Sequence, residues 1–300
     1  MRYQGKVGRR SFLNATAMSA ATAVVCFAPE TLRAAGKPQK FIAGYAPFTR
    51  GSVESYWQAC DECAGLGFRH IEVDNSRLKI AQAYMDRISE YREEMAKRNL
   101  SLVGLGMSGS FTDPSIQKET FDEHMLVGRF VQAAGGNYIS TMSEPEPDEM
   151  PAYVRFAAEL GKRLREETGV RIGFHPHAGS ARSQVFRRML DETKPEDFGF
   201  VLDTGWLRAG GQDPLSVLKA YRSRLITLHL KDFDPDVERE RRGRLVKGQT
   251  VVLGRGVIDF PPIIDYLKET EFEGQVLGEI GLRSTAEMKA FMVDTLGLRI

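Results

Sequence analysis

The sequence predicts a (β/α)8 barrel, an α/β fold in which eight parallel strands alternate with helices, on three observations. From residue 41 onward, short β-branched or apolar runs alternate with segments of helical periodicity, the pattern of βα units and a parallel sheet. Eight such units lie within about 265 residues, which suits a barrel of roughly 250 residues. No G-x-G-x-x-G string follows the first run, which disfavours the alternative, a doubly wound open sheet that binds a dinucleotide.

Each strand is expected where a short apolar or β-branched run occurs: 41–46, 69–74, 101–106, 137–142, 170–175, 198–203, 225–231 and 275–280. Each helix is expected where apolar residues recur at helical spacing: 53–65, 78–98, 119–134, 150–167, 182–192, 214–222, 261–269 and 284–295. The polar, charged segment 233–250 is expected to form a loop over the C-terminal face, as a lid or a solvated connection. All these elements belong to a single domain, 36–300.

The composition restricts the class of protein. The chain is 42% hydrophobic and 27% charged with a formal net charge of +1, which is ordinary for a globular domain and gives no basic footprint for nucleic acid. Its three cysteines are too few for a disulfide scaffold. Cys60 and Cys63 form a C-x-x-C string on an expected helix, and we interpret them as packing thiols rather than a redox pair.

Residues 1–35 have the pattern of an export signal. Basic residues precede a short apolar run at 15–28, and small residues follow it around Ala35. The run is shorter than the roughly 18 to 20 residues that span a bilayer, so no stable membrane insertion is expected. The string that contains Arg9 and Arg10 resembles the bacterial twin-arginine signal. This resemblance implies the twin-arginine export machinery as a partner, and a periplasmic or secreted protein that is exported folded.

The alternation of side chains along each strand predicts which polar residues point into the barrel, because alternate residues of a barrel strand point inward while the others pack on the helices. In the seventh strand Ile226 and Leu228 are expected to face the helices. His229 and Lys231 then point inward. The same parity sends inward a further set of polar residues in or after other strands: Glu72, His175, His177, Asp203 and Glu279.

Several of these residues converge at the C-terminal ends of their strands: His175, His177, Asp203, His229 and Glu279. A barrel core tolerates few ionisable groups unless they are paired or bind a metal ion. Imidazole nitrogen and carboxylate oxygen are ligands of divalent ions such as Mn²⁺, Zn²⁺ or Co²⁺. The pattern therefore predicts a metal site at the C-terminal face, whereas His70 and His124 are assigned to structure.

The strings that carry these residues resemble one family: Phe174–Gly179, Val201–Trp206, Thr227–Asp232, Leu253–Phe260 and Gly278–Glu279. They are similar to the xylose isomerase-like TIM barrels, the sugar phosphate isomerase/epimerase group, over about 41–300. Within the group, the His-Pro-His-x-Gly string most resembles the inosose dehydratases. The resemblance is specific for the superfamily and not for the substrate.

The resemblance implies one divalent metal ion, with Mn²⁺ as the first expectation and Zn²⁺, Co²⁺ or Mg²⁺ as alternatives. Carried over residue by residue, the ligands are His175, Asp203, His229 and Glu279. Many members have Glu at the position of His175, which leaves the choice between His175 and His177 open. The candidates for contact with a small carbohydrate or cyclitol substrate are Glu72, Glu144, Trp206 and Lys231.

We expect an enzyme that removes a proton next to the carbonyl of a keto-sugar, keto-glycoside or inosose, with the metal ion as a Lewis acid. Glu279 is the candidate base, His177 the candidate acid toward a departing oxygen, and Lys231 a further catalytic candidate. One carboxylate base and one histidine acid suit elimination, so lyase or dehydratase chemistry ranks ahead of its alternative, a metal-dependent sugar isomerase or epimerase.

Three other classes of function remain alternatives. A Schiff-base aldolase would use Lys231 as its amine. A nuclease like the AP endonucleases of the same superfamily needs more histidines than the five in this chain. A non-catalytic sugar-binding module would bind its ligand without turning it over.

Overall fold

The computed structural model describes residues 37–49, 51–73, 77–241, 244–280 and 284–300. The expected export signal at 1–35 lies outside the described residues. None of the helices in the described ranges combines the length and the apolar character needed to cross a membrane.

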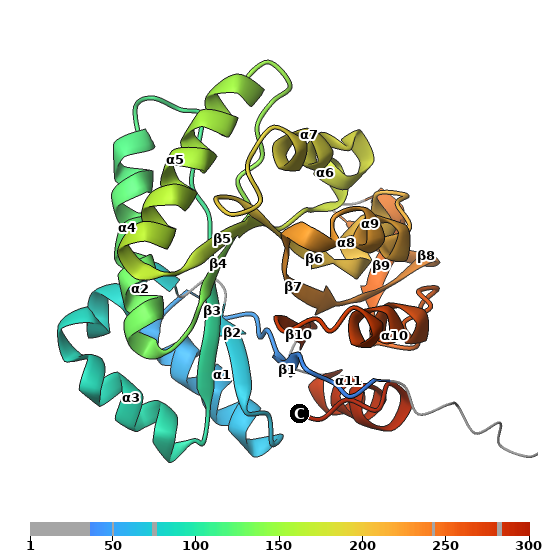
Figure 1. Ribbon diagram of the computed structural model, residues 1–300. Coiled ribbons are helices and arrows are strands. Elements are labelled where there is room, and N and C mark those ends of the chain that lie inside the picture. The colour runs from blue at the N-terminus through green and yellow to red at the C-terminus, as the bar shows by residue number, and fades with distance from the viewer. Residues whose placement is uncertain (1–36, 50, 74–76, 242–243, 281–283) are drawn as a thin grey trace, which may run out of the picture. The chain divides into compact units, whose positions relative to one another are not determined.

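Eight parallel strands close into a barrel in the order β1-β10-β7-β6-β5-β4-β3-β2 (Figure 1). Their bounds are β1 (Ile42–Tyr45), β2 (His70–Val73), β3 (Ser101–Met107), β4 (Tyr138–Thr141), β5 (Arg171–Phe174), β6 (Gly199–Asp203), β7 (Leu225–Leu230) and β10 (Gln275–Gly278). All eight strands expected from the sequence are present. The closed order confirms the (β/α)8 barrel and excludes the open doubly wound sheet.

Helices follow the strands and cover the outside of the barrel (Figure 1). Their bounds are α1 (Val53–Gly65), α2 (Arg77–Tyr84), α3 (Ile88–Lys97), α4 (Gln117–Ala134), α5 (Met150–Thr168), α6 (Ala178–Ser183), α7 (Val185–Asp191), α8 (Thr204–Ala209), α9 (Pro214–Ala220), α10 (Pro261–Glu269) and α11 (Thr285–Ala290). The segment 78–98, expected as one helix, is divided by a 3-10 turn, Met85–Arg87. Gln184 adopts a left-handed conformation with φ of 58° and separates α6 from α7.

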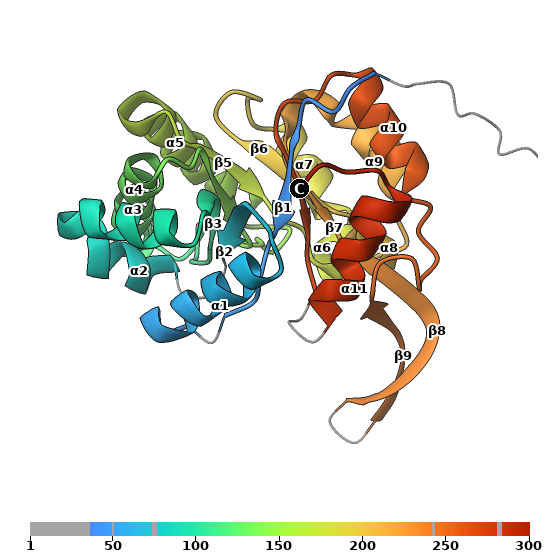
Figure 2. The ribbon, with the colours of Figure 1, turned by 90° about the horizontal axis from the view of Figure 1, so that it is seen from below.

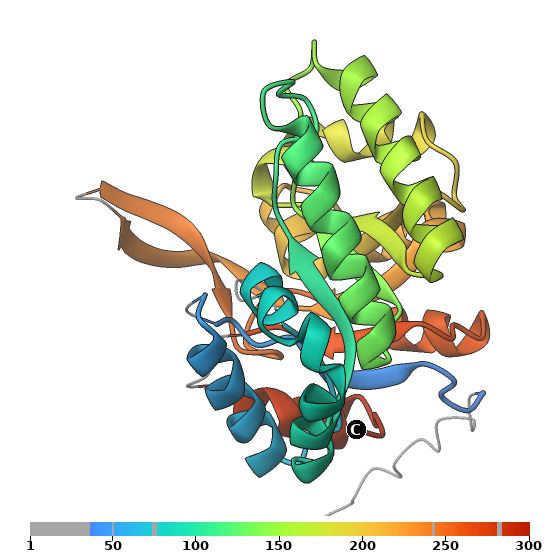
Figure 3. The same cartoon turned by 90° about the vertical axis from the view of Figure 1, so that its left-hand side faces the viewer.

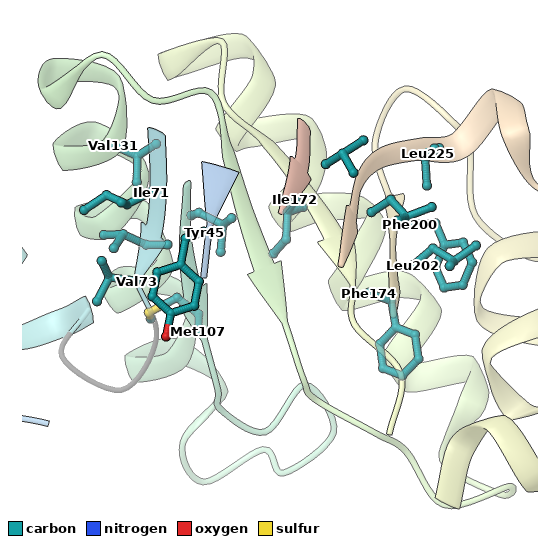
Figure 4. Packing of buried hydrophobic residues seen from close by; sticks show 14 of the residues in the cluster. Tyr45, Ile71, Val73, Met107, Val131, Ile172, Phe174, Phe200, Leu202 and Leu225 are labelled. Carbon is teal, nitrogen blue, oxygen red and sulfur yellow. The ribbon is translucent and has the colours of Figure 1, made fainter. Parts of the chain in front are cut away.

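The main core lies between the outer face of the strands and the helices. Alternate strand residues such as Ile71, Val73, Phe174 and Leu202 point away from the barrel axis in this layer (Figure 4). Cys60 and Cys63 are buried in the same layer, and burial raises the pKa of the Cys60 thiol to about 12. Both thiols therefore pack in the core, as expected.

A smaller apolar cluster fills the barrel interior and includes Ile226, which corrects one expectation. Strands β6 and β7 shift register at Ile226, which has no partner in β6. A Cβ atom added to Gly173 or Gly199 would lie 2.9 or 2.5 Å from Ile226 Cδ1, so this side chain lies against the inner face. The outward assignment of Ile226 is wrong because one extra residue in a strand reverses the alternation on one side of the bulge.

The segment expected as a loop at 233–250 is an antiparallel hairpin, β8 (Asp232–Arg241) and β9 (Arg244–Val251). It projects away from the barrel (Figures 2 and 3). Asp232 anchors its base, because its carboxylate accepts hydrogen bonds from the backbone N–H groups of Phe233, Gly254, Gly256 and Ile258. The charged segment that suggested a loop is a two-stranded ribbon, and the pairing between its strands supplies an order that the composition does not reveal.

Candidate active site

Four strands bring together the four side chains expected to bind a metal ion. His175 follows β5, Asp203 ends β6, His229 lies in β7, and Glu279 follows β10. All four are buried, and one ligand atom from each lies within 4.8 Å of the others. We call these four residues the ligand group. The convergence inferred from strand parity is therefore present in the structure.

His177 does not join the ligand group. Its side chain is 41% exposed, and its ring centroid lies 5.5 Å from that of His175. The geometry thus favours His175 over His177 as a ligand, since the strand ends at Phe174 and the chain has turned toward the rim of the barrel at His177.

Both ring nitrogens of His175 are buried without a hydrogen-bond partner among the described residues, and Asp203 Oδ2 has there only its ion pair with Lys231. His175 Nε2 lies 3.5 Å from Asp203 Oδ2 and 3.6 Å from Glu279 Oε2, near enough for a common cation and too far for strong hydrogen bonds. Buried polar atoms left without partners are costly. A bound cation between these atoms would satisfy them, so the residues present fit a metal ion.

Lys231 lies behind the ligand group. Its Nζ is 2.9 Å from Asp203 Oδ2 and 2.7 Å from Glu279 Oε1. Burial alone would lower the pKa of Lys231, but the carboxylates of Asp203 and Glu279 raise it above its usual value. An ammonium group has no lone pair to attack a carbonyl, which argues against the Schiff-base alternative.

A second set of contacts fixes His229. Its Nδ1 lies 2.7 Å from Glu279 Oε2 and its Nε2 lies 2.8 Å from Glu72 Oε2. Burial would lower the pKa of His229, but the charges of Glu72 and Glu279 raise it to about 10. Glu72 also accepts hydrogen bonds from Tyr138 and from Ser140, whose Oγ lies 2.6 Å from Glu72 Oε1. Glu72 therefore orients the His229 ring, with Nδ1 toward the ligand group, as carboxylates commonly do behind metal-binding histidines.

The site carries an unbalanced charge. Three buried carboxylates, Glu72, Asp203 and Glu279, face one buried ammonium, Lys231, which leaves two net negative charges before any histidine is protonated. Isolated buried charges are costly unless they are compensated. Either two protonated imidazoles or one divalent cation balances this cluster, which is a second reason why the donor set fits a divalent ion.

Above the ligand group lies a pocket with about 460 Å³ of empty space, part of it open to solvent. Its lining includes three of the four ligand-group residues, together with Glu72, Ser140 and His177, and an apolar set: Ala46, Pro47, Phe48, Met142 and Trp206. Trp206 therefore lies where a substrate contact was expected. Its backbone N–H donates to Asp203 Oδ1 over 2.7 Å, so Asp203 caps α8, a helix not foreseen from the sequence.

Glu144 reaches the rim but does not line the pocket. Its Oε1 accepts hydrogen bonds from Ser180 Oγ over 2.7 Å and from the His177 backbone N–H over 3.3 Å, and it lies 3.7 Å from His177 Nδ1. In this structure Glu144 contacts the loop that carries His177. Its expected contact with substrate stays a prediction.

Sequence reasoning missed Phe48 and Met142 in the pocket, and Tyr138 and Ser140 around Glu72. Phe48 and Met142 follow β1 and β4, at the strand ends where such barrels bind their ligands, so their position in the sequence was an available signal. Tyr138 and Ser140 share the inward parity of β4. Their contact with Glu72 depends on barrel closure and had no local signal.

Comparison with known proteins identifies the family. The family described as "Xylose isomerase-like TIM barrel" matches residues 60–290, and the chain belongs to this family. The inosose dehydratase of Clostridium beijerinckii is 27% identical over 255 residues, covering 76% of this chain and 83% of that protein. The inosose dehydratase of Lacticaseibacillus casei is 31% identical over 256 residues, with 76% and 83% covered. On these matches the chain is an enzyme.

Solved structures show the same fold at low sequence identity. A xylose isomerase-like TIM barrel protein from Mycobacterium smegmatis, solved in complex with magnesium, matches with a TM-score of 0.65 and 15% identity, covering 84% of this chain and 96% of that one. The IOLI protein, solved with a bound zinc atom, matches with a TM-score of 0.62 and 19% identity, covering 84% and 98%.

Proposed function

We propose that this enzyme is a divalent-metal-dependent lyase or dehydratase that acts on a keto-sugar, keto-glycoside or inosose. The observation that carries the proposal is the buried ligand group, which lies beneath an open pocket, has two unpartnered ring nitrogens on His175, and holds more carboxylates than ammonium groups. The inosose dehydratase relatives support a carbohydrate or cyclitol substrate and elimination of water.

His175, Asp203, His229 and Glu279 would hold the ion. When bound, the ion supplies a Lewis acid that polarises the carbonyl oxygen of the substrate. Mn²⁺ is our first candidate because the family resemblance implies it; the mixed set of imidazole and carboxylate ligands suits several divalent ions. Zinc in one related structure and magnesium in another keep both as alternatives.

In this proposal, different residues of the protein accept and donate the protons. Burial would raise the pKa of Glu279, but Lys231 and His229 hold it well below the usual range, so Glu279 is a carboxylate that can accept the proton next to the carbonyl. We assign to His177 the donation of a proton toward the departing oxygen. Its side chain is 41% exposed, and its backbone N–H donates to Glu144, which supports this assignment. Lys231 fixes the carboxylates of Glu279 and Asp203.

This arrangement favours elimination over epimerisation. An epimerase that uses two bases needs a second free carboxylate, and Glu72 is the other carboxylate that lines the pocket. Glu72, however, already accepts hydrogen bonds from Tyr138 and Ser140 and contacts His229. The alternative of a metal-dependent isomerase or epimerase requires Glu72 to leave these partners.

The experiment is to incubate the metal-loaded protein in D₂O with a panel of inososes, keto-sugars and 3-keto-glycosides, and to follow the products by NMR. We expect an unsaturated ketone, together with water or an aglycone. Glu279→Gln should abolish it, and the metal content of this variant reports whether the loss is one of metal or of base. An epimer that carries solvent deuterium, with nothing eliminated, would instead support the isomerase or epimerase.

We also propose that residues 1–35 are a twin-arginine signal, so that the domain 36–300 acts in the periplasm or outside the cell. The support is the sequence pattern alone: paired arginines at Arg9 and Arg10, an apolar run, and small residues before the barrel begins.

A further inference from the structure

The pocket is divided into a polar floor and a largely apolar rim that also carries His177. Its floor residues lie in strands or directly after them: Glu72, Ser140, His175, His229 and Glu279. Its apolar residues lie in the connections beyond the strand ends: Ala46, Pro47, Phe48, Met142 and Trp206. Strand ends form the bottom of such a pocket and the connections rise above it. A ligand that fits both parts has an oxygen-rich group at one end and an apolar group at the other.

Two aromatic rings dominate the rim. Phe48 is 40% exposed. Among the large apolar side chains that are exposed in the described structure, Phe48 is the one that lines this pocket. Lys231 Nζ lies 5.5 Å from the centroid of Phe48 and 4.8 Å from that of Trp206, so both rings lie near the same buried ammonium, and both line the pocket. Exposed aromatic faces at the mouth of a pocket are binding surfaces for aromatic or apolar groups.

The charges of the pocket disfavour an anionic ligand. No arginine or lysine is among its lining residues in the described part of the chain. The nearest ammonium, Lys231, is already shared by Asp203 and Glu279. Among the described lining residues, a phosphate group at the rim would find no arginine or lysine to pair with, whereas a neutral group needs none.

We propose that the rim, formed by Phe48, Trp206 and Met142, is an aglycone subsite, and that the substrate is a neutral keto-glycoside with an aromatic or other apolar aglycone. This inference rests on the proposed function and selects among its substrates. The proton leaves the carbon between the carbonyl and the anomeric carbon, and its electron pair forms a double bond to the anomeric carbon. The anomeric C–O bond breaks, and the aglycone oxygen takes up a proton and departs as a phenol or alcohol. No oxidant, reductant or water is consumed.

The first test measures binding without turnover. Phenyl β-glucoside and methyl β-glucoside lack the ketone and cannot eliminate, so calorimetry on the Mn²⁺-supplied protein compares their aglycones alone. We expect the phenyl glucoside to bind about tenfold more tightly, equivalent to about 1.4 kcal/mol. Phe48→Ala should remove most of this preference, and Val257→Ala, at another exposed apolar position that lies outside this pocket, should keep it. Equal affinities in the unsubstituted protein, or an undiminished preference in Phe48→Ala, would overturn the proposal.

The second test uses turnover of phenyl 3-keto-β-glucoside and of an inosose. Phe48→Ala should raise KM for the aryl substrate about tenfold and change KM for the inosose much less, whereas an equal change for both would overturn the subsite. The proposed function and the aglycone subsite can be refuted independently of each other. Elimination of the inosose without any aryl preference leaves the proposed function and removes the subsite. A phenyl preference in binding, without elimination from either ketone, leaves the subsite and removes the proposed reaction.

Discussion

Binding of a divalent ion should stabilise the fold by an amount that depends on Asp203. Without the ion, three carboxylates face one ammonium in a buried site, and their remaining negative charge is balanced only as far as the imidazoles of His175 and His229 are protonated. An ion that binds only the folded state at 100 times its Kd raises the free energy of unfolding by about 2.7 kcal/mol. For a domain of this size, each kcal/mol shifts Tm by roughly 2 to 4 °C, so Mn²⁺ should raise Tm by roughly 5 to 11 °C over the protein in EDTA.

Asp203→Asn is the variant that isolates this effect. An asparagine keeps an oxygen that can accept the Trp206 N–H, so the cap of α8 survives, while the charge that attracts the ion falls. We expect differential scanning fluorimetry to show a shift below about 1 °C in this variant at the same Mn²⁺ concentration. Glu144→Gln, outside the ligand group, should keep the full shift. An undiminished shift in Asp203→Asn, confirmed by stoichiometric metal in that variant, would refute the assignment of the ligand group.

Three further predictions concern packing, the hairpin and export. Gly161→Ala should destabilise the fold by about 1 to 3 kcal/mol in urea titrations, because the added Cβ would lie 1.7 Å from the carbonyl oxygen of Asp197; unchanged stability would show that α5 can move aside. Asp232→Ala should speed amide hydrogen exchange at Gly254 and Gly256, which lose their acceptor, and unchanged exchange would mean that the hairpin base is held by other contacts. Replacing Arg9 and Arg10 by Lys should leave the precursor in the cytoplasm, and normal recovery in the periplasm by fractionation would exclude the twin-arginine route.

The ligand group was accessible from the sequence because its geometry is mostly local. A strand alternates its side chains with a period of two, so the apolar residues Leu228 and Leu230 were enough to turn His229 inward. Closing eight such strands brings their C-terminal ends to one face, which placed His175, Asp203 and Glu279 beside it. Where the alternation is interrupted, as at the bulge of Ile226, the same reasoning failed.

The sequence by itself thus predicted the eight-stranded barrel and a cluster of histidines and carboxylates at its C-terminal face, since both follow from local periodicity and strand order, whereas the structure separated His177 from the other four residues. Only the tertiary structure decided which charges compensate one another and which side chains form the mouth of the pocket. Glu72 contacts His229, 157 residues away along the chain, only because β2 and β7 face each other across a closed barrel. Phe48 and Trp206 approach the same ammonium from separate connections. Such contacts depend on distances through space between segments far apart in the chain, and no local pattern in the sequence encodes them.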